Sequence, residues 1–186
     1  NNELSIAKCK LIESKGLICD WSDLEIQAIW LEKLGLEGSA IYPLGLFYIE
    51  DNPLKQLQRA KKLYKEKYFK KSNNIHHSNN NKIRIGYFSS DFRAHPTMYL
   101  IASILKLHDK SKFEIYLYSF APKEDKYTEI VKKSGCIFKD IKKLNYIEAV
   151  ELARNDHLDI AIDLMGYIEN NRTNIFSCDI NSFDII

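Results

Sequence analysis

The sequence predicts an α/β fold in which a parallel sheet follows a segment of helices. Short apolar runs typical of buried strands recur about every 25 residues in the second part of the chain, with a helical pattern between each pair. This spacing favours right-handed crossovers between parallel strands. Helical patterns fill residues 1–69, and residues 70–81, rich in Asn and Ser, predict a flexible connector between the two parts.

The first part of the helical segment contains two expected helices. The first covers residues 3–15. The second is indicated by Ser22 and Glu25, whose spacing matches a capping box, and Gly35 is a suitable end for it.

Another helix is expected to begin with Asn52 as its cap and Pro53 in its first turn. Its predicted apolar face consists of Leu54, Leu57, Leu63, Tyr64 and Tyr68. Its other face is basic and carries Lys55, Arg59, Lys61, Lys62, Lys65 and Lys67. Such a strip could bind RNA, but no exposed aromatic residues alternate with the lysines, which favours a solvated helix face.

The sheet region alternates strands and helices. The expected strands are residues 83–88, 113–120, 136–141 and 158–165. Between them we expect a helix over 98–107 with Ile101, Ile104 and Leu105 facing inward. A second helix should begin at the cap Asp125 and stop at Gly135, and a third should run from the Asn145–Glu148 capping box to Arg154.

Composition limits the partners and the compartment. A net charge of +2 is too small to indicate nucleic acid or an anionic membrane. The four cysteines show no CxxC or metal-ligand spacing, which predicts free thiols in a reducing compartment: Cys9, Cys19, Cys136 and Cys178. No apolar run approaches the roughly 18 residues of a membrane span, and no signal peptide is evident. We therefore expect a cytoplasmic protein without a metal.

The loop after the first strand, residues 89–97, is one candidate site, because ligands of open parallel sheets bind beyond the carboxyl ends of the strands. It lacks the GxGxxG and P-loop patterns that cradle phosphates. His95 stands just before a helix, where the helix dipole favours a neutral imidazole that can accept a proton. It could equally cap the helix, and Ser90 and Asp91 could be turn residues.

The loop after the fourth strand is the second candidate. Asp163 stands at the carboxyl end of the strand, where it could act on a ligand or simply cap the loop. Gly166 allows a positive φ or a close approach of the backbone, Tyr167 follows it, and Arg172 could contact an anion or be an ordinary surface residue.

Both loops carry motifs of a known family. The string from Gly86 to Thr97, GYFSSDFRAHPT, resembles the segment that opens the catalytic region of the O-GlcNAc transferase family. Residues 112–122 and 159–176 are similar to later strands and loops of that region. Upstream, residues 19–21 and 42–53 resemble the helical link between the family's TPR array and its catalytic half, so the resemblance covers roughly residues 18–176.

The resemblance implies the Rossmann-like N-terminal half of a GT-B glycosyltransferase. Its members transfer N-acetylglucosamine from UDP-GlcNAc to Ser or Thr of proteins, with inversion and without a metal. The expected partners are a protein acceptor and a missing C-terminal catalytic half that holds UDP. The implied catalytic residues are His95 and Asp163. The implied substrate-binding residues are Ser90, Asp91, Pro96, Thr97, Gly166, Tyr167 and Arg172.

The chain departs from the family pattern at three places. Ile168 replaces a threonine, and Thr173 stands where many bacterial members have proline. The expected catalytic half-domain covers residues 82–178. Residues 179–186 after it look like an unmatched tail, which indicates a truncation. We expect the chain alone to be inactive. Two alternatives stay open: a non-catalytic interaction module or decayed remnant, and a small nucleotide-binding or receiver-type domain, which would need an acidic pocket and a later lysine.

Overall fold

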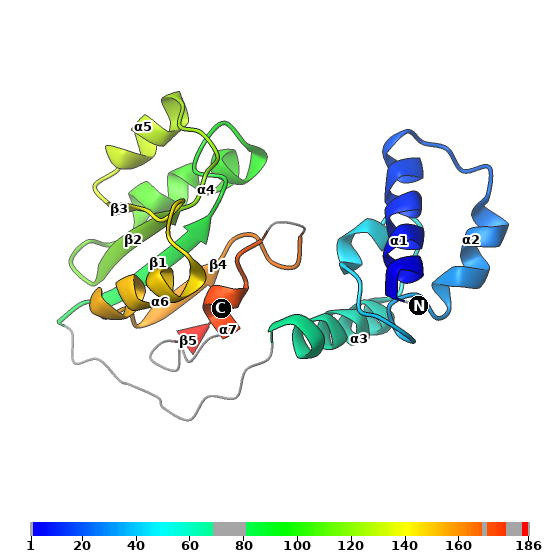
Figure 1. The fold of residues 1–186 in the computed structure, drawn as a ribbon. Coiled ribbons are helices and arrows are strands. Elements are labelled where there is room, and N and C mark those ends of the chain that lie inside the picture. Colours follow the sequence, from blue (N-terminus) through cyan, green and yellow to red (C-terminus); the bar gives the residue numbers. More distant parts are fainter. Residues whose placement is uncertain (1, 69–80, 169–170, 178–183, 186) are drawn as a thin grey trace. The chain divides into compact units, whose positions relative to one another are not determined.

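The computed structural model describes residues 2–68, 81–168, 171–177 and 184–185. Figure 1 shows the path of the chain. Its contacts divide the chain into two compact units, a helical unit of residues 1–69 with 167–171, and a sheet unit of residues 70–166 with 172–186. Nearly all of the expected connector at 70–81 lies outside the described residues.

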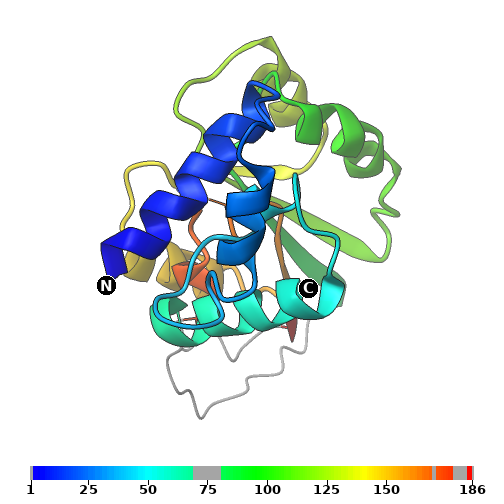
Figure 2. The same ribbon diagram turned by 90° about the vertical axis from the view of Figure 1, so that its right-hand side faces the viewer.

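The helical unit is built from helices alone, as expected (Figures 1 and 2). They are α1 (Asn2–Leu17), α2 (Leu24–Leu31), a 3-10 helix (Pro43–Leu46), α3 (Pro53–Leu63) and a π-helical turn (Tyr64–Tyr68). The predicted cap of α3 is confirmed, since the Asn52 side chain accepts a hydrogen bond from the Lys55 backbone nitrogen at 3.0 Å.

The capping box expected at Ser22 is wrong. The residue before α2 is Asp23, whose side chain makes no capping hydrogen bond. The Ser22 hydroxyl donates instead to Asp20 at 2.7 Å, because a short polar side chain can bind a near neighbour outside the helix as easily as a helix amide. The helix ends at Leu31, and Gly35 takes a positive φ of 72° in the turn beyond it.

The solvated face expected on α3 is wrong at Arg59, which is fully buried. Its guanidinium forms an ion pair with Glu50 and donates to the carbonyl oxygens of Leu34 at 2.8 Å and Leu31 at 2.9 Å. These partners offset the desolvation of the charge. The predicted apolar face is correct at Leu63 and Tyr68, but it fails at the exposed Leu54 and Leu57.

The sheet unit contains a parallel sheet in the order β3-β2-β1-β4-β5. Its strands are β1 (Ile83–Ser89), β2 (Phe113–Ser119), β3 (Ile137–Asp140), β4 (Ile160–Asp163) and β5 (Asp184–Ile185). Every neighbouring pair is parallel, which confirms the predicted fold class. The short β5 was not expected, and it lies within the stretch 179–186; the other residues of that stretch fall outside the described part.

In the described part of the chain, helices accompany the sheet (Figure 1). They are α4 (Pro96–Leu107), α5 (Lys126–Lys132), α6 (Tyr146–Asn155) and the single turn α7 (Asn174–Ser177). Two predicted caps are confirmed. The Asp125 carboxylate accepts from the Tyr127 backbone nitrogen at 2.8 Å, and Asn145 with Glu148 forms the capping box of α6.

One face of the sheet packs against α4 and α5. Alternate strand residues supply it, as the period of a β-strand requires. The buried members are Ile85, Tyr87, Leu117, Met98, Leu105 and Val131, among others. Ile104 was expected to face inward, but half of its side chain is exposed, since Leu105 one residue later faces the sheet.

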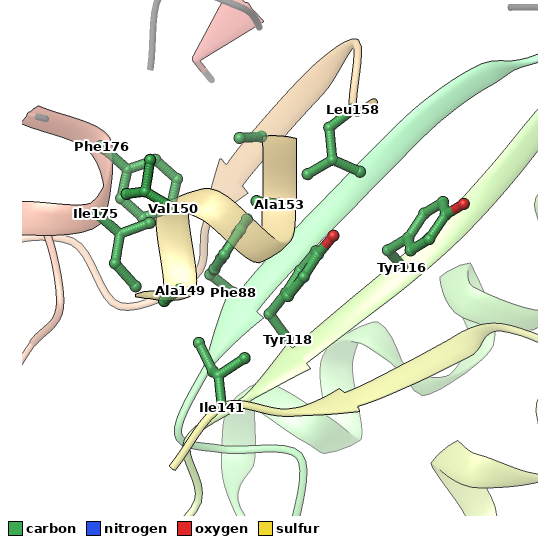
Figure 3. Close-up of a cluster of buried hydrophobic side chains, with 11 residues drawn as sticks. Phe88, Tyr116, Tyr118, Ile141, Ala149, Val150, Ala153, Leu158, Ile175 and Phe176 are labelled. Atoms are coloured by element: carbon green, nitrogen blue, oxygen red, sulfur yellow. The ribbon is translucent and has the colours of Figure 1, made fainter. Parts of the chain in front are cut away.

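The opposite face packs against α6 and α7 (Figure 3). Phe88 stacks on Tyr118 with ring centroids 4.3 Å apart and meets Phe176 edge-on at 5.1 Å. Gly86 leaves room for this aromatic layer: a Cβ there would lie 2.5 Å from Leu158 and 3.0 Å from the Tyr118 ring. The two cores hold β1 rigidly from both sides and so fix the starting point of the loop that follows it.

No helix in the described part of the chain is long and apolar enough to cross a membrane. The described cysteines Cys9, Cys19 and Cys136 are free thiols, as the sequence predicts, and Cys178 lies outside the described residues.

Candidate functional site

Two loops leave the carboxyl edge of the sheet side by side. β1 and β4 are parallel neighbours, with Phe88 opposite Asp163 in the register, so residues 89–97 and 164–173 start at the same edge. The loops touch through Met165, whose sulfur lies 3.5 Å from Ser89 Oγ and 3.4 Å from Ser90 Oγ. His95 and Asp163 therefore follow the carboxyl ends of two neighbouring parallel strands.

The first loop opens with a tight turn that buries a carboxylate. The Asp91 backbone nitrogen donates to Ser89 Oγ at 2.9 Å, and the Ser90 hydroxyl donates to Asp91 Oδ1 at 3.1 Å. Arg93 Nη2 donates to the same oxygen at 3.3 Å. With 7% of its side chain exposed, Asp91 is held under the loop, and its Oδ2 is left for another partner.

That partner is His95, the cap of α4. Its backbone is extended, and Pro96 follows in the first helical turn, a position that suits proline. Nδ1 lies 3.3 Å from the Thr97 backbone nitrogen, 3.2 Å from Thr97 Oγ1 and 3.2 Å from Asp91 Oδ2. All the ring's contacts in the structure involve Nδ1, and 36% of the side chain is exposed. Nε2 has no hydrogen-bond partner among the described residues.

α5 holds the middle of the same loop in place. Phe92 is fully buried, and its carbonyl oxygen accepts from Thr128 Oγ1 at 2.8 Å. The Ala94 backbone nitrogen donates to Asp125 Oδ2 at 2.7 Å, while the other oxygen of Asp125 caps α5. Two residues of one helix turn therefore fix the backbone on both sides of Arg93.

The second loop is closed by Asp163. Its Oδ1 accepts from the Met165 backbone nitrogen at 2.9 Å, and its Oδ2 accepts from Thr173 Oγ1 at 3.3 Å. Burial raises the pKa of the Asp163 carboxyl above its usual range, although these hydrogen bonds act in the opposite direction. Gly166 takes a positive φ of 59° between the two partners. Asp163 thus caps this loop in the structure, one of the two roles considered from the sequence.

Arg172 also binds within the protein. Its two terminal nitrogens donate to the carbonyl oxygens of Ile141, at 2.8 Å, and Leu144, and the guanidinium lies 5.5 Å above the Phe120 ring. Burial lowers the pKa of this guanidinium. The side chain joins the second loop to the connection between β3 and α6.

The structure gathers Ser90, Asp91, His95, Pro96 and Thr97 into one cluster and places Asp163 and Gly166 beside it through Met165. Arg172 donates instead to Ile141 and Leu144, on the connection between β3 and α6. Tyr167 belongs to the helical unit, where its ring stacks on Tyr68 with centroids 6.1 Å apart.

Sequence reasoning missed the contributions of Met165 and Asp125 to this arrangement. Asp125 carried a signal, its position as a helix cap, but nothing local indicated that its second oxygen reaches Ala94, 31 residues earlier. No group of three or more His, Cys, Asp or Glu side chains could hold a metal ion within the described residues. The chemistry that the cluster offers is a half-exposed imidazole with a free nitrogen beside a buried carboxylate.

The chain is similar to known proteins. The chain is 33% identical over 100 residues to the Arabidopsis thaliana protein described as a probable UDP-N-acetylglucosamine–peptide N-acetylglucosaminyltransferase, SPINDLY, a match covering 52% of this chain and 11% of that protein. The Caenorhabditis elegans UDP-N-acetylglucosamine–peptide N-acetylglucosaminyltransferase is 32% identical over 101 residues, which are 53% of this chain and 9% of that protein. The chain thus spans about a tenth of these relatives.

A solved structure supports the fold. An O-GlcNAc transferase variant from Thermobaculum terrenum matches with a TM-score of 0.72 at 22% identity, over 92% of this chain and 34% of that one. The model of glycosyl transferase family 41 matches residues 53–185, including most of the stretch expected to be an unmatched tail. These findings confirm the resemblance seen in the GYFSSDFRAHPT segment, and the chain belongs to glycosyl transferase family 41.

Proposed function

We propose that this chain forms the acceptor-side part of an inverting glycosyltransferase that transfers N-acetylglucosamine from UDP-GlcNAc to Ser or Thr hydroxyls of proteins. Membership of family 41 and the printed names of the relatives support the reaction class. The observation that carries the proposal is the unengaged Nε2 of His95 at the ligand edge of a parallel sheet. A nitrogen in that position can accept the proton of an attacking hydroxyl.

The other site residues support His95 in this proposal. Asp163 and Gly166 shape the neighbouring loop, which contacts the first loop through Met165. Pro96 and Thr97 start α4 and set the direction of the ring. We assign no metal to the reaction, and the polar groups present fit a proton-transfer role.

The diphosphate of the donor must be bound by cations or backbone amides. The two candidate loops do not offer these in a recognised phosphate-binding arrangement. Neither loop has a glycine-rich phosphate cradle. Arg93 and Arg172, the nearest arginines, already donate to Asp91 and to backbone carbonyls. Stabilising a departing diphosphate requires donors arranged around it in advance. We therefore propose that a second catalytic half supplies most UDP contacts, and that the chain alone is inactive.

A UDP-release assay tests whether the chain alone is inactive. The chain, incubated with UDP-GlcNAc and a Ser/Thr-containing peptide, should release no more UDP than a boiled control. Turnover that His95→Ala abolishes would show that the donor also binds within this chain and would contradict the division.

The role of His95 is tested in a protein that contains this segment together with a second catalytic half. Loss of a general base lowers rates about 10²–10⁴-fold. We expect His95→Ala to lower kcat by that order while the dissociation constant of UDP stays within about twofold, since the substitution removes an interaction made in the transition state. An equal loss of UDP affinity would contradict the assignment.

One observation favours a second function, a non-catalytic interaction module. Leu100, Ile104 and Leu107 form an apolar stripe at helical spacing on α4, with 78%, 50% and 80% of their surfaces exposed. A docking module would keep its partner affinity in His95→Ala and lose it in Leu100→Glu. An enzyme would instead lose turnover in His95→Ala and keep it in Leu100→Glu. The two variants therefore distinguish the two functions.

For the compartment we propose the cytoplasm. The free thiols of Cys9, Cys19 and Cys136 support it, since such thiols persist in reducing surroundings. Imaging of a tagged protein in its native cell is the direct check.

A further inference from the structure

Asp91 and His95 form a pair at the carboxyl edge of the sheet. Asp91 Oδ2 lies 3.2 Å from His95 Nδ1, with 7% of the Asp91 side chain and 36% of the His95 side chain exposed. The second carboxylate oxygen accepts from Ser90 Oγ and Arg93 Nη2. Ser90 and Arg93 thus orient the carboxylate through Oδ1, and its Oδ2 faces the imidazole.

Three groups lie around Nδ1: the Thr97 backbone nitrogen, the Asp91 carboxylate and the Thr97 hydroxyl, which at 3.2 Å can donate or accept and so suits either tautomer. As the cap of α4, an unprotonated Nδ1 would accept from the Thr97 backbone nitrogen at 3.3 Å. With the proton on Nδ1, the ring would present an N–H group to the ionised carboxylate, whose Oδ2 lies 3.2 Å away. An ionised carboxylate has only lone pairs to offer, so an unprotonated Nδ1 would face it with a second lone pair and repel it.

The carboxylate should win this competition. Hydrogen bonds to a charged partner are roughly twice as strong as those between neutral groups. The Thr97 amide lies at a helix N-terminus, where water can take the place of a side-chain cap.

We propose that Asp91 is a positioning residue that keeps the proton of neutral His95 on Nδ1 and leaves the lone pair of Nε2 for the acceptor. The catalytic use of this lone pair rests on the proposed function. There, the hydroxyl proton passes to Nε2 while the hydroxyl oxygen bonds to the anomeric carbon. The bond from that carbon to the diphosphate oxygen breaks, and its electron pair leaves on the diphosphate. Asp91 then faces the imidazolium that has formed.

The tautomer can be measured on the chain itself, without donor or acceptor. Long-range ¹H–¹⁵N correlation spectra of ¹⁵N-histidine-labelled protein, taken above pH 8, separate protonated from unprotonated ring nitrogens. His95 is one of five histidines, and its signals are identified by their loss in His95→Gln. We expect a protonated Nδ1 and an unprotonated Nε2 in the wild-type protein. The reverse assignment in the wild-type protein overturns the proposal.

Asp91→Asn is the matched variant, because an asparagine amide can donate to Nδ1 and so favours the other tautomer. We expect the two nitrogen signals of His95 to exchange character in this variant. Asp140→Asn is the control at the same edge of the sheet: Asp140 caps the turn at Lys142 and does not contact the ring, so the His95 signals should not move. Unchanged signals in Asp91→Asn, with the other four histidine signals at their folded positions, would contradict the positioning role.

The kinetic consequence belongs to a protein that includes the second catalytic half. There, Asp91→Asn should lower kcat about 10²-fold or more with KM for the donor within about twofold. The tautomer measurement tests the positioning role of Asp91, and the turnover measurement tests the proposed function. A protein with the expected tautomers in which His95→Ala leaves turnover unchanged would sink the proposed function and still support the positioning role.

Discussion

The loops that follow β1 and β4 leave the same edge of the sheet, but they use their polar side chains differently. In the second loop, the charged groups of Asp163 and Arg172 bind backbone and hydroxyl groups of the protein itself. In the first loop, the Ser90 hydroxyl donates to Asp91, and His95 Nε2 has no hydrogen-bond partner among the described residues. The second loop therefore uses its charged groups within the protein, and the first leaves one imidazole nitrogen without a hydrogen-bond partner among the described residues. The same residue types at equivalent strand ends do not imply the same task.

Arg172→Ala should give the largest loss of stability at this edge. Two carbonyl oxygens would lose charged donors, and a hydrogen bond to a charged group contributes about 1.5–3 kcal/mol. We expect the free energy of unfolding to fall by about 3 kcal/mol in urea titrations followed by circular dichroism. Arg93→Ala, in the first loop, is the matched control and should cost less than about 1 kcal/mol, because that side chain is partly exposed. Equal losses would remove the distinction between the loops.

Gly166→Ala should have the next largest effect. The position has a φ of 59°, which costs an L-residue about 1–2 kcal/mol, while a new Cβ would meet nothing within 4 Å. The loss is thus one of backbone conformation alone. Gly166→Asn should recover part of it, since asparagine tolerates the left-handed region better than alanine. If asparagine were no better than alanine in the same urea titration, backbone strain would not be the cause.

Asp163→Asn should change the pH dependence of stability more than stability itself. Burial raises the folded-state pKa of this carboxyl above its usual 3.8, so the folded state binds the proton more tightly than the unfolded state. In the wild-type protein this group therefore makes the free energy of unfolding fall as the pH rises from 3.8 through the raised pKa. The variant lacks that contribution, and asparagine can still accept from the Met165 backbone nitrogen.

Paired urea titrations at pH 4 and pH 7 measure this effect. The stability of Asp163→Asn relative to wild type should improve between the two pH values, and the difference at pH 7 should stay within about 1 kcal/mol. A relative stability that worsens toward pH 7 would mean that the ionised carboxylate is favoured in the fold.

His95→Ala should have the smallest effect on stability. The side chain is 36% exposed, so its contact with Asp91 is partly screened by solvent, and its removal should cost less than about 1 kcal/mol. His95→Asn should restore most of it, because asparagine is a good cap. A loss above about 2 kcal/mol in a thermal or urea titration would show that His95 is a structural residue like Arg172.

The sequence predicted much of this fold because its signals are local. The run FEIYLYSF marks β2, and the caps of α5 and α6 lie within three residues of their partners. Adjacent parallel strands then place both loops at one edge. The local signals failed for two arginines whose hydrogen-bond partners lie far away in the sequence. Arg59 binds carbonyls 25 and 28 residues away, and Arg172 binds carbonyls 31 and 28 residues away, so neither burial follows from periodicity.

The contacts of Asp125 and Thr128 with the first loop affect the entropy of ligand binding. Fixing one backbone residue costs about 1–2 kcal/mol of conformational entropy. Because the α5 turn already fixes the backbone at Phe92 and Ala94, folding rather than ligand association carries that cost. Substitutions in the first turn of α5 would therefore weaken ligand affinity without removing any group that meets the ligand. The backbone of the candidate site is thus held in advance by a helix more than thirty residues away in sequence.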